Sequence, residues 1–250
     1  MISDSLAPLL DFVYPPRCAA CGDAIGAQGG LCPACWADLV IPTEPACALC
    51  QRPFGSCGPG EGAVCGPCLA SPPRHDGIHA GTLYTQTSRK LALALKHGGR
   101  LALAPMLARL IAARIEEANP DCVLVPVPLH RRRLWSRGYN QSVLLARELQ
   151  RLGHGELLVD GLERIKATPS LGGLGARARS KVLSGAIRVR PSAKARLAGK
   201  DILLVDDVLT SGATSDACVK ALKKDGAKSV RIACFTRVLD EALDPVRAAS

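Results

Sequence analysis

Two adjacent carboxylates followed by a turn of small residues form the part of this chain best suited to chemistry. Asp206 and Asp207 follow the apolar segment 202–205, which is typical of a buried parallel strand. Residues 210–214 (Thr-Ser-Gly-Ala-Thr) then offer hydroxyls and free backbone N–H groups where a helix is expected to begin, a setting that suits a phosphate. Carboxylates repel phosphate but accept hydrogen bonds from hydroxyls. The pattern therefore predicts a sugar phosphate, with its phosphate in the turn and a vicinal diol at the two acids.

Eight cysteines in the first third of the chain form four Cys-x-x-Cys pairs, a spacing that places two thiolates on one side of a turn. Ten residues separate the first two pairs and fourteen separate the last two, which suits zinc ribbons. Sequential pairing predicts two tetrahedral zinc sites, and interleaved pairing is the open alternative. The eight residues are Cys18, Cys21, Cys32, Cys35, Cys47, Cys50, Cys65 and Cys68.

Disulfides and an iron–sulfur or redox site are the competing interpretations of these thiols. Disulfides need an oxidising compartment, and the N-terminal segment lacks the basic start of an export signal and is typical of a short amphipathic helix. Structural zinc is therefore favoured. Cys57 stands outside the pairs and is expected to be a free thiol, whereas Cys122, Cys218 and Cys234 lie in contexts typical of core residues.

Length and composition indicate a small unit followed by a larger one. The boundary is expected in the segment 70–73, which gives a double zinc ribbon over 1–72 and a second domain over 73–250. The first unit has too little apolar material to fold without metal, whereas the second can bury a sizeable core. No apolar run approaches the roughly 18 residues of a membrane span, so we expect a soluble protein of the cytoplasm.

The formal net charge of +10 indicates anionic ligands. Two basic clusters, at 130–137 and 177–181, lie where a ligand carrying pyrophosphate needs cations, and the same charge suits nucleic acid. Aromatic residues make up only 3% of the chain, which argues against a stacking platform for single strands. Any binding of nucleic acid is therefore expected to be electrostatic, independent of sequence and sensitive to salt.

The second unit alternates short apolar strands with amphipathic helices, which predicts an α/β fold with a doubly wound, mostly parallel sheet. Strands are expected at 81–86, 121–127, 157–165, 185–189, 202–205 and 229–235, and helices at 88–96, 101–118, 139–152 and 215–224. A basic loop is expected after Pro128, and a longer loop at 166–179. Such sheets bind ligands beyond the carboxyl ends of their strands, where the acid pair and the basic loop both fall.

The acid pair and its turn resemble the signature with which type I phosphoribosyltransferases bind phosphoribosyl pyrophosphate (PRPP). Segment 94–100 (Ala-Leu-Lys-His-Gly-Gly-Arg) and the block 125–142, with its Val-Pro-Val-Pro-Leu-His and Arg-Gly-Tyr-Asn-Gln-Ser stretches, extend the similarity. Together with the cysteine pairs, they make nearly the whole chain resemble the ComF family, in which a double zinc ribbon is fused to a type I phosphoribosyltransferase domain. The family includes competence proteins.

The resemblance implies binding of PRPP with Mg²⁺ and assigns roles to particular residues. The ribose hydroxyls are expected at Asp206 and Asp207, which are also the candidate catalytic residues. The 5-phosphate is expected at Thr210, Ser211, Gly212, Ala213 and Thr214. Arg133, Arg137 and Arg179 are candidate contacts of the pyrophosphate, and His130 is a candidate general base.

The long loop departs from the family pattern at two positions. Leu171 stands where Gln is usual and Val182 where Asn is usual, which puts polar contacts from this loop in doubt. The positions that fit are Arg164, Thr168, Leu174 and Arg179.

Three functions agree with these features. The first is a phosphoribosyltransferase that supports DNA uptake in natural transformation, in which the protein positions PRPP and stabilises charge as pyrophosphate leaves. The second is a sensor that binds PRPP without chemistry. The third is a DNA-associated scaffold, with the zinc ribbon as a docking module and with single-stranded DNA and a competence helicase at the inner membrane as partners. No pattern in the sequence identifies an acceptor.

Overall fold

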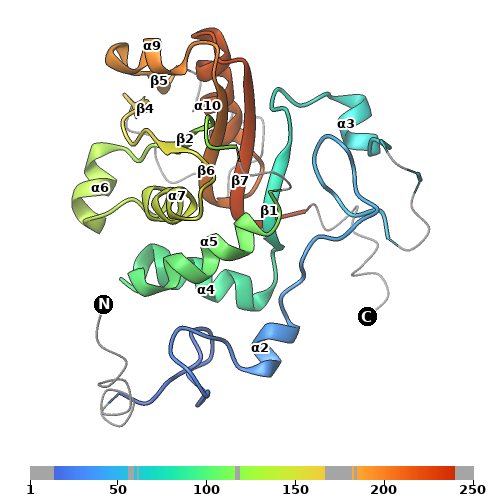
Figure 1. Cartoon of the computed structure of the whole chain (residues 1–250), viewed down its shortest axis with the longest axis vertical. Coiled ribbons are helices and arrows are strands. Elements are labelled where there is room, and N and C mark those ends of the chain that lie inside the picture. The colour runs from blue at the N-terminus through green and yellow to red at the C-terminus, as the bar shows by residue number, and fades with distance from the viewer. Residues whose placement is uncertain are drawn as a thin grey trace.

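A parallel five-stranded sheet forms the centre of the computed structural model, which describes residues 14–55, 59–60, 62–115, 119–166, 182 and 185–239 (Figure 1). The strand order is β1-β7-β6-β2-β3, and every neighbouring pair is parallel. The strands are β1 (Ile78–Leu83), β2 (Val123–Pro126), β3 (Glu156–Leu157), β6 (Asp201–Leu209) and β7 (Ser229–Arg237). The predicted parallel α/β fold is therefore confirmed, and the carboxyl ends of all five strands meet at one edge.

Strand β6 is longer than its sequence suggests. The apolar segment 202–205 predicts a strand that stops before the acids, but β6 continues to Leu209 because β7 offers partners along its whole length. Asp206 pairs in register with Cys234, and Leu209 with Arg237. The acid pair therefore lies inside a strand at the centre of the sheet, which fixes its backbone more firmly than a turn would.

Helices cover both faces of the sheet and bury alternate residues of β6. Leu203 and Val205 pack in one hydrophobic cluster with α4 (Gln86–His97), α5 (Ala104–Ala112) and α7 (Gln141–Arg151). Ile202 and Leu204 pack in a second cluster with α10 (Ala213–Lys224) and α9 (Lys194–Leu197) on the opposite face. This alternation is the period of two expected of a strand that is covered on both sides.

Three predicted elements differ from the observed ones. The single helix expected at 101–118 is a 3-10 turn, η2 (Leu101–Leu103), followed by α5, whose Pro105 suits a helix start. The basic segment after Pro128 is not a loop but α6 (Arg131–Arg137), which ends at Gly138 in the left-handed conformation. Within 157–165 the chain turns at Gly161, so β3 and β4 (Leu162–Arg164) belong to different sheets, and β4 pairs antiparallel with β5 (Ile187–Val189).

The region before the sheet contains two short helices, α2 (Pro33–Ala37) and α3 (Gly66–Ala70), each of which begins directly after a cysteine. The second domain is predicted to begin at residue 73, in the coil that connects α3 to β1. A short η3 helix (Pro191–Ala193) precedes α9. Within the described ranges, every helix is too short or too polar to span a bilayer.

Candidate functional site

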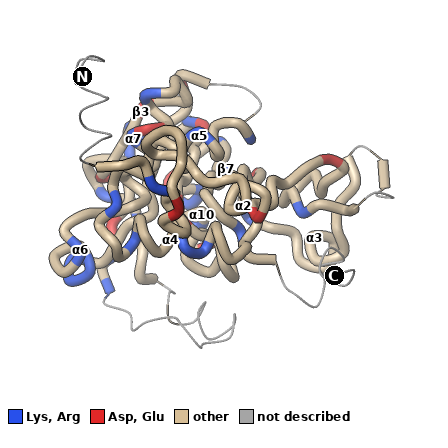
Figure 2. Tube along the Cα trace, turned by 90° about the horizontal axis from the view of Figure 1, so that it is seen from below, with Lys and Arg blue, Asp and Glu red and all other residues tan. Residues whose placement is uncertain are grey.

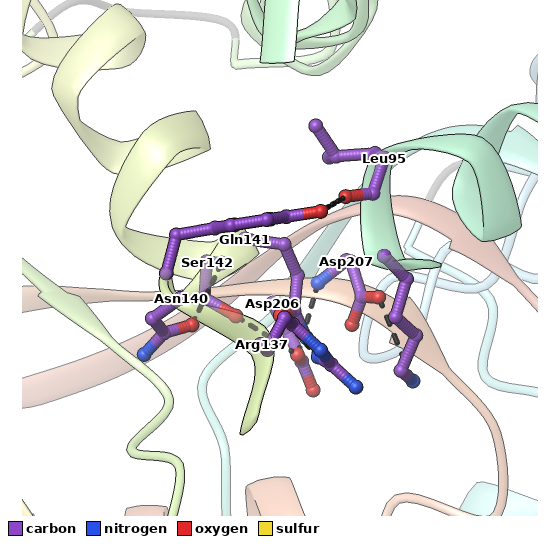
Figure 3. A network of polar contacts seen from close by, with 9 residues as sticks. Leu95, Arg137, Asn140, Gln141, Ser142, Asp206 and Asp207 are labelled. Atoms are coloured by element: carbon purple, nitrogen blue, oxygen red, sulfur yellow. Dashed lines mark hydrogen bonds and ion pairs between the residues drawn. The ribbon is translucent and has the colours of Figure 1, made fainter. Parts of the chain in front are cut away.

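The two carboxylates of β6 are buried at the carboxyl edge of the sheet (Figure 3). Asp206 is 9% exposed, and its Oδ1 accepts the backbone N–H of Asp207 at 2.9 Å and the Ser142 hydroxyl at 3.3 Å. Asp207 is 3% exposed, and its Oδ2 lies 3.7 Å from Lys96 Nζ. Burial and the neighbouring charge of Asp207 raise the pKa of Asp206 well above its ordinary value.

One oxygen of this pair is a buried acceptor without a donor. Among the described residues, no group donates a hydrogen bond to Asp207 Oδ2, since the Lys96 ammonium stands at ion-pair distance only. Leaving a buried carboxylate oxygen unsatisfied costs about 1–3 kcal/mol or more. This oxygen is therefore suited to accept a hydrogen bond from a ligand hydroxyl.

The start of α7 forms the wall beside Asp206. Asn140 caps the helix, because its Oδ1 accepts the Ser142 N–H at 3.0 Å while its Nδ2 donates to the Val127 carbonyl at 3.0 Å. The Tyr139 hydroxyl donates to the Leu95 carbonyl at 2.5 Å and so joins α7 to α4 (Figure 3). The segments 94–100 and 125–142, which are far apart in sequence, thus meet at the acid pair.

Basic side chains gather next to the two acids. Lys96 and His97 end α4, and Arg137 ends α6, where its Nη1 donates to Gln141 Oε1 at 2.7 Å. Burial and the positive charges of Arg137 and Lys96 lower the pKa of His97, although Asp207 acts in the opposite direction. The cluster is therefore a cationic wall to which a pyrophosphate could bind.

Two of the three arginines predicted to contact pyrophosphate lie among the described residues. Arg137 lies beside the acid pair, whereas Arg133 lies near Arg164, whose pKa is lowered by burial and by the charge of Arg133. Arg179 lies outside the described residues. Lys96 was not singled out from the sequence, although the Leu-Lys-x-x-Gly pattern of its segment was a usable signal.

The turn 210–214 surrounds a hollow of about 60 Å³ that Asp206 also lines. Gly212 precedes α10 with φ 71°, a left-handed conformation that favours glycine. The hollow lies where the backbone N–H groups and the positive end of the α10 dipole meet, an arrangement suited to an anion. The hollow and the acid pair therefore adjoin, whereas a phosphate in the hollow and the individual roles of Thr210, Ser211, Gly212, Ala213 and Thr214 remain predictions.

The cysteines form two tetrads in the sequential arrangement, and within each tetrad the sulfur atoms lie within 4.8 Å of one another. The first tetrad is Cys18, Cys21, Cys32 and Cys35, and the second is Cys47, Cys50, Cys65 and Cys68. Four sulfur ligands at such distances fit a structural Zn²⁺ ion in each tetrad.

One thiol in each tetrad is made acidic by backbone N–H groups. Burial opposes ionisation of Cys18, but hydrogen bonds from backbone groups at Cys32 and Cys21 outweigh it and lower its pKa to about 6. Burial likewise opposes ionisation of Cys47, and backbone groups, chiefly that of Cys65 at 3.3 Å from its sulfur, lower its pKa to about 7. Because the thiolate is the form that binds metal, both knuckles are prepared for a cation.

The remaining cysteines and His130 have structural surroundings. Cys218 and Cys234 are fully buried in the core, as predicted, and burial raises the pKa of Cys122 to about 11. Cys57 lies outside the described residues, as do Thr168, Leu171, Leu174 and most of the predicted loop at 166–179. His130 caps α6, where its Nδ1 accepts the backbone N–H of Arg132 at 3.3 Å, so its ring nitrogen is engaged in the fold.

Comparison with known proteins agrees with both parts of this description. Residues 9–69 match the double zinc ribbon domain, and residues 136–248 match the phosphoribosyl transferase domain. The chain is 31% identical over 227 residues to the DNA utilization protein YhgH of Escherichia coli K12. The aligned region covers 84% of this chain and 98% of the relative. Competence protein F of Haemophilus influenzae is 31% identical over 224 residues (86% and 94%), and competence protein ComFC of Bacillus subtilis is 27% identical over 216 residues (83% and 83%). With its two cysteine tetrads, its parallel sheet and relatives of this similarity along nearly their whole length, the chain belongs to the ComF family.

Proposed function

We propose that this protein binds PRPP together with Mg²⁺ at the carboxyl edge of the sheet. The observation that carries the proposal is the buried Asp207 Oδ2, to which no described residue donates a hydrogen bond. The neighbouring Asp206 lines a hollow of about 60 Å³, which has room for a phosphate. PRPP has both complementary groups, a 5-phosphate and a ribose diol.

The assigned roles follow from the charges of the site. The 5-phosphate binds in the turn 210–214, and the ribose hydroxyls donate to Asp206 and Asp207. Lys96 and Arg137 face the pyrophosphate, whose bound Mg²⁺ neutralises part of its charge. Because the hydroxyls stabilise the ionised form of Asp206, PRPP binding is expected to release a proton in the pH range where the free carboxyl is still protonated.

Transfer of the phosphoribosyl group is the activity that this site supports. The bond between C1 and the pyrophosphate oxygen breaks with both electrons on pyrophosphate, and a lone pair of the acceptor forms the new bond to C1. The acceptor then loses its proton to solvent or to a base. The buried acid pair stabilises the positive charge that develops on the ribose, so the protein contributes position and electrostatics.

Calorimetry with PRPP and Mg²⁺ tests the binding step. Asp207→Asn is expected to weaken binding by about 1.5–3 kcal/mol, since it replaces a charged acceptor at the diol. Asp121→Asn, an exposed acid at the opposite end of β2, is the matched control and should bind as the native protein does. If the double variant Asp206→Asn/Asp207→Asn also binds like the native protein, the proposed orientation is wrong.

Turnover separates an enzyme from a sensor. Purified protein with PRPP, Mg²⁺ and cell extract as the source of acceptor is expected to release pyrophosphate, and the Asp206→Asn/Asp207→Asn variant should not. Binding without release would favour the sensor.

A role in DNA uptake is the second part of the proposal. It is supported by the net charge of +10 and by the names of the relatives, which refer to DNA utilization and competence. We expect single-stranded DNA to bind at low salt, with log affinity falling linearly in log salt concentration. Fluorescence anisotropy with a labelled oligonucleotide tests this, and failure to bind even at low salt would leave the role to protein partners such as a helicase.

A further inference from the structure

A second and much larger opening lies outside the hollow at 210–214. This cleft of about 1170 Å³ lies between α6 and α7 on one side and β4 with the turn before it on the other. Asn140, whose Oδ1 accepts the N–H of Ser142 beside Asp206, also forms part of its wall. Small-molecule pockets usually measure about 300–1,000 Å³, so this cleft has room for more than a single ring.

The cleft is lined by five arginines and two carboxylates. The arginines are Arg131, Arg132, Arg147, Arg164 and Arg190, and the acids are Asp160 and Glu163. Both acids already have cationic partners: Arg190 Nη2 lies 3.3 Å from Asp160 Oδ1, and Arg188 Nε lies 2.6 Å from Glu163 Oε1. The lining therefore carries an excess of positive charge. Figure 2 shows that Lys and Arg are also grouped along α6.

Arg164 forms the buried part of this positive lining. Arg164 lies on β4 and is 9% exposed. Its burial and the nearby positive charge of Arg133 both lower its pKa, because both disfavour the charged guanidinium. A phosphate accepts hydrogen bonds from guanidinium groups, and these charge-assisted bonds are strong where water is excluded. The inner wall is therefore suited to an anionic group.

An exposed indole stands at the outer wall. Trp135 on α6 is 89% exposed, and Leu134 beside it is also exposed, although such side chains are usually covered. Val143 and Val159 add further apolar surface to the lining. A flat indole over an apolar floor suits the stacking of an aromatic ring, which is worth about 1–3 kcal/mol for a nucleobase.

We propose that this cleft binds a nucleotide, with its ring against Trp135 and its phosphate at the arginines. A free mononucleotide and the terminal nucleotide of a single strand carry the same chemistry. The cleft and the hollow at 210–214 have no lining residue in common, so the two sites can be tested separately. Asn140, which lines the cleft, lies two positions before Ser142, and Ser142 donates a hydrogen bond to Asp206. A nucleotide in the cleft would therefore lie close to the acid pair.

The experiment uses the intrinsic fluorescence of the indole. The chain has two tryptophans, so Trp36→Phe leaves Trp135 as the only reporter. In this background we expect thymidine 5′-monophosphate to change the Trp135 emission saturably. Thymidine and inorganic phosphate should each bind at least about tenfold more weakly, because each offers only one of the two recognised groups. A 5′-phosphorylated oligothymidylate that binds more tightly than the monophosphate identifies the strand as the source, and equal affinity identifies the free nucleotide.

Two substitutions of exposed arginines provide the control. Arg147→Gln removes a cleft cation and should weaken the monophosphate about tenfold, the loss expected for one charge-assisted hydrogen bond. Arg109→Gln removes an exposed cation of α5 outside the cleft and should leave affinity unchanged. Asp207→Asn should also leave nucleotide binding unchanged, which separates this site from the PRPP site. Equal effects of the two arginine variants, an unchanged Trp135 emission, or binding of phosphate as tight as that of the nucleotide would each overturn the proposal.

Discussion

The two cysteine tetrads have the same ligands but different relations to the sheet (Figure 1). In the first, Cys21 is exposed, and Arg100 Nη1 donates to the Ala19 carbonyl at 3.1 Å to connect this ribbon to the end of α4. In the second, all four cysteines are buried and belong to the same hydrophobic cluster as α10 and one face of β6. Arg237, at the end of β7, also donates a hydrogen bond to the Cys50 carbonyl.

This difference decides what each zinc ion stabilises. Metal binding to a site that exists only in the folded chain contributes directly to folding, by roughly 10–16 kcal/mol in zinc-finger peptides. For the first tetrad that contribution goes to a ribbon whose Ala19, Ala20 and Leu31 pack against the cluster of α4, α5 and α7, while its cysteines lie outside that cluster. For the second it reaches the sheet, because Arg237 pairs in register with Leu209, the residue directly before the turn 210–214. The same four-cysteine ligand set is thus expected to stabilise mainly a ribbon in one place and the carboxyl edge of the sheet in the other.

Loss of one ligand from each tetrad is expected to give the largest contrast. Cys65→Ser should lower the free energy of unfolding of the whole chain by several kcal/mol, since it removes a ligand from the tetrad that shares the core. Cys32→Ser should unfold the first ribbon and leave the main thermal transition largely in place. Calorimetry with zinc analysis checks both: the native protein should carry close to two zinc ions and each variant close to one. Equal loss of the main transition in the two variants would contradict the comparison.

The contact between β7 and the second ribbon is expected to have the next largest effect. Arg237→Gln removes a charged donor from the Cys50 carbonyl and should lower the free energy of unfolding by about 1.5–3 kcal/mol. Release of the second zinc to a chelator should become faster, whereas release of the first should not change. The chelator assay resolves the two ions, since the first tetrad has an exposed ligand and the second is buried. Unchanged release from the second tetrad would show that Arg237 does not join the ribbon to the sheet.

Asp206 is expected to make the stability of the sheet depend on pH in the direction opposite to that of the zinc ribbons. Because the folded state raises the pKa of Asp206, the folded protein holds a proton that the unfolded chain releases. This contribution is fully present below the unfolded pKa of about 3.9 and is lost as pH rises through the folded pKa. Asp206→Asn is therefore expected to melt higher than the native protein at pH 8, with a difference that shrinks toward pH 4.

Zinc has the opposite pH dependence, because thiolates are protonated and release metal as pH falls. Both proteins are therefore compared at each pH with zinc in excess. The effect of zinc on the melting temperature is then the same in both and cancels in the difference. A difference in melting temperature that does not vary with pH would contradict the raised pKa of Asp206.

The contact between α4 and the first ribbon is expected to matter least. Arg100→Gln removes a donor to the Ala19 carbonyl at an exposed position and should cost about 0.5–1 kcal/mol, confined to the first ribbon. Faster release of the first zinc with an unchanged main transition is the expected result. A lower main transition would mean that the first ribbon is joined to the domain as firmly as the second.

Features encoded within one turn or one strand could be predicted from the sequence alone. The Cys-x-x-Cys spacing predicts the knuckles, because two thiolates three positions apart converge wherever the turn lies. The apolar run, the acid pair and the small-residue turn predict β6, its carboxyl edge and the start of α10, since strand period and turn chemistry are local properties. Most helices and strands of the second domain are close to their predicted positions for the same reason.

Contacts between distant segments were decided only by the tertiary structure. Spacing allowed sequential or interleaved tetrads, and the path of the chain brings the sequential sets together. Lys96 meets Asp207, and Ser142 meets Asp206, because α4 and α7 pack on the same face of β6. The continuation of β6 through the acids depends on a partner strand more than twenty residues away. The burial of all four ligands in one tetrad and the exposure of Cys21 in the other depend on which surface each ribbon packs against, a property that no cysteine spacing contains.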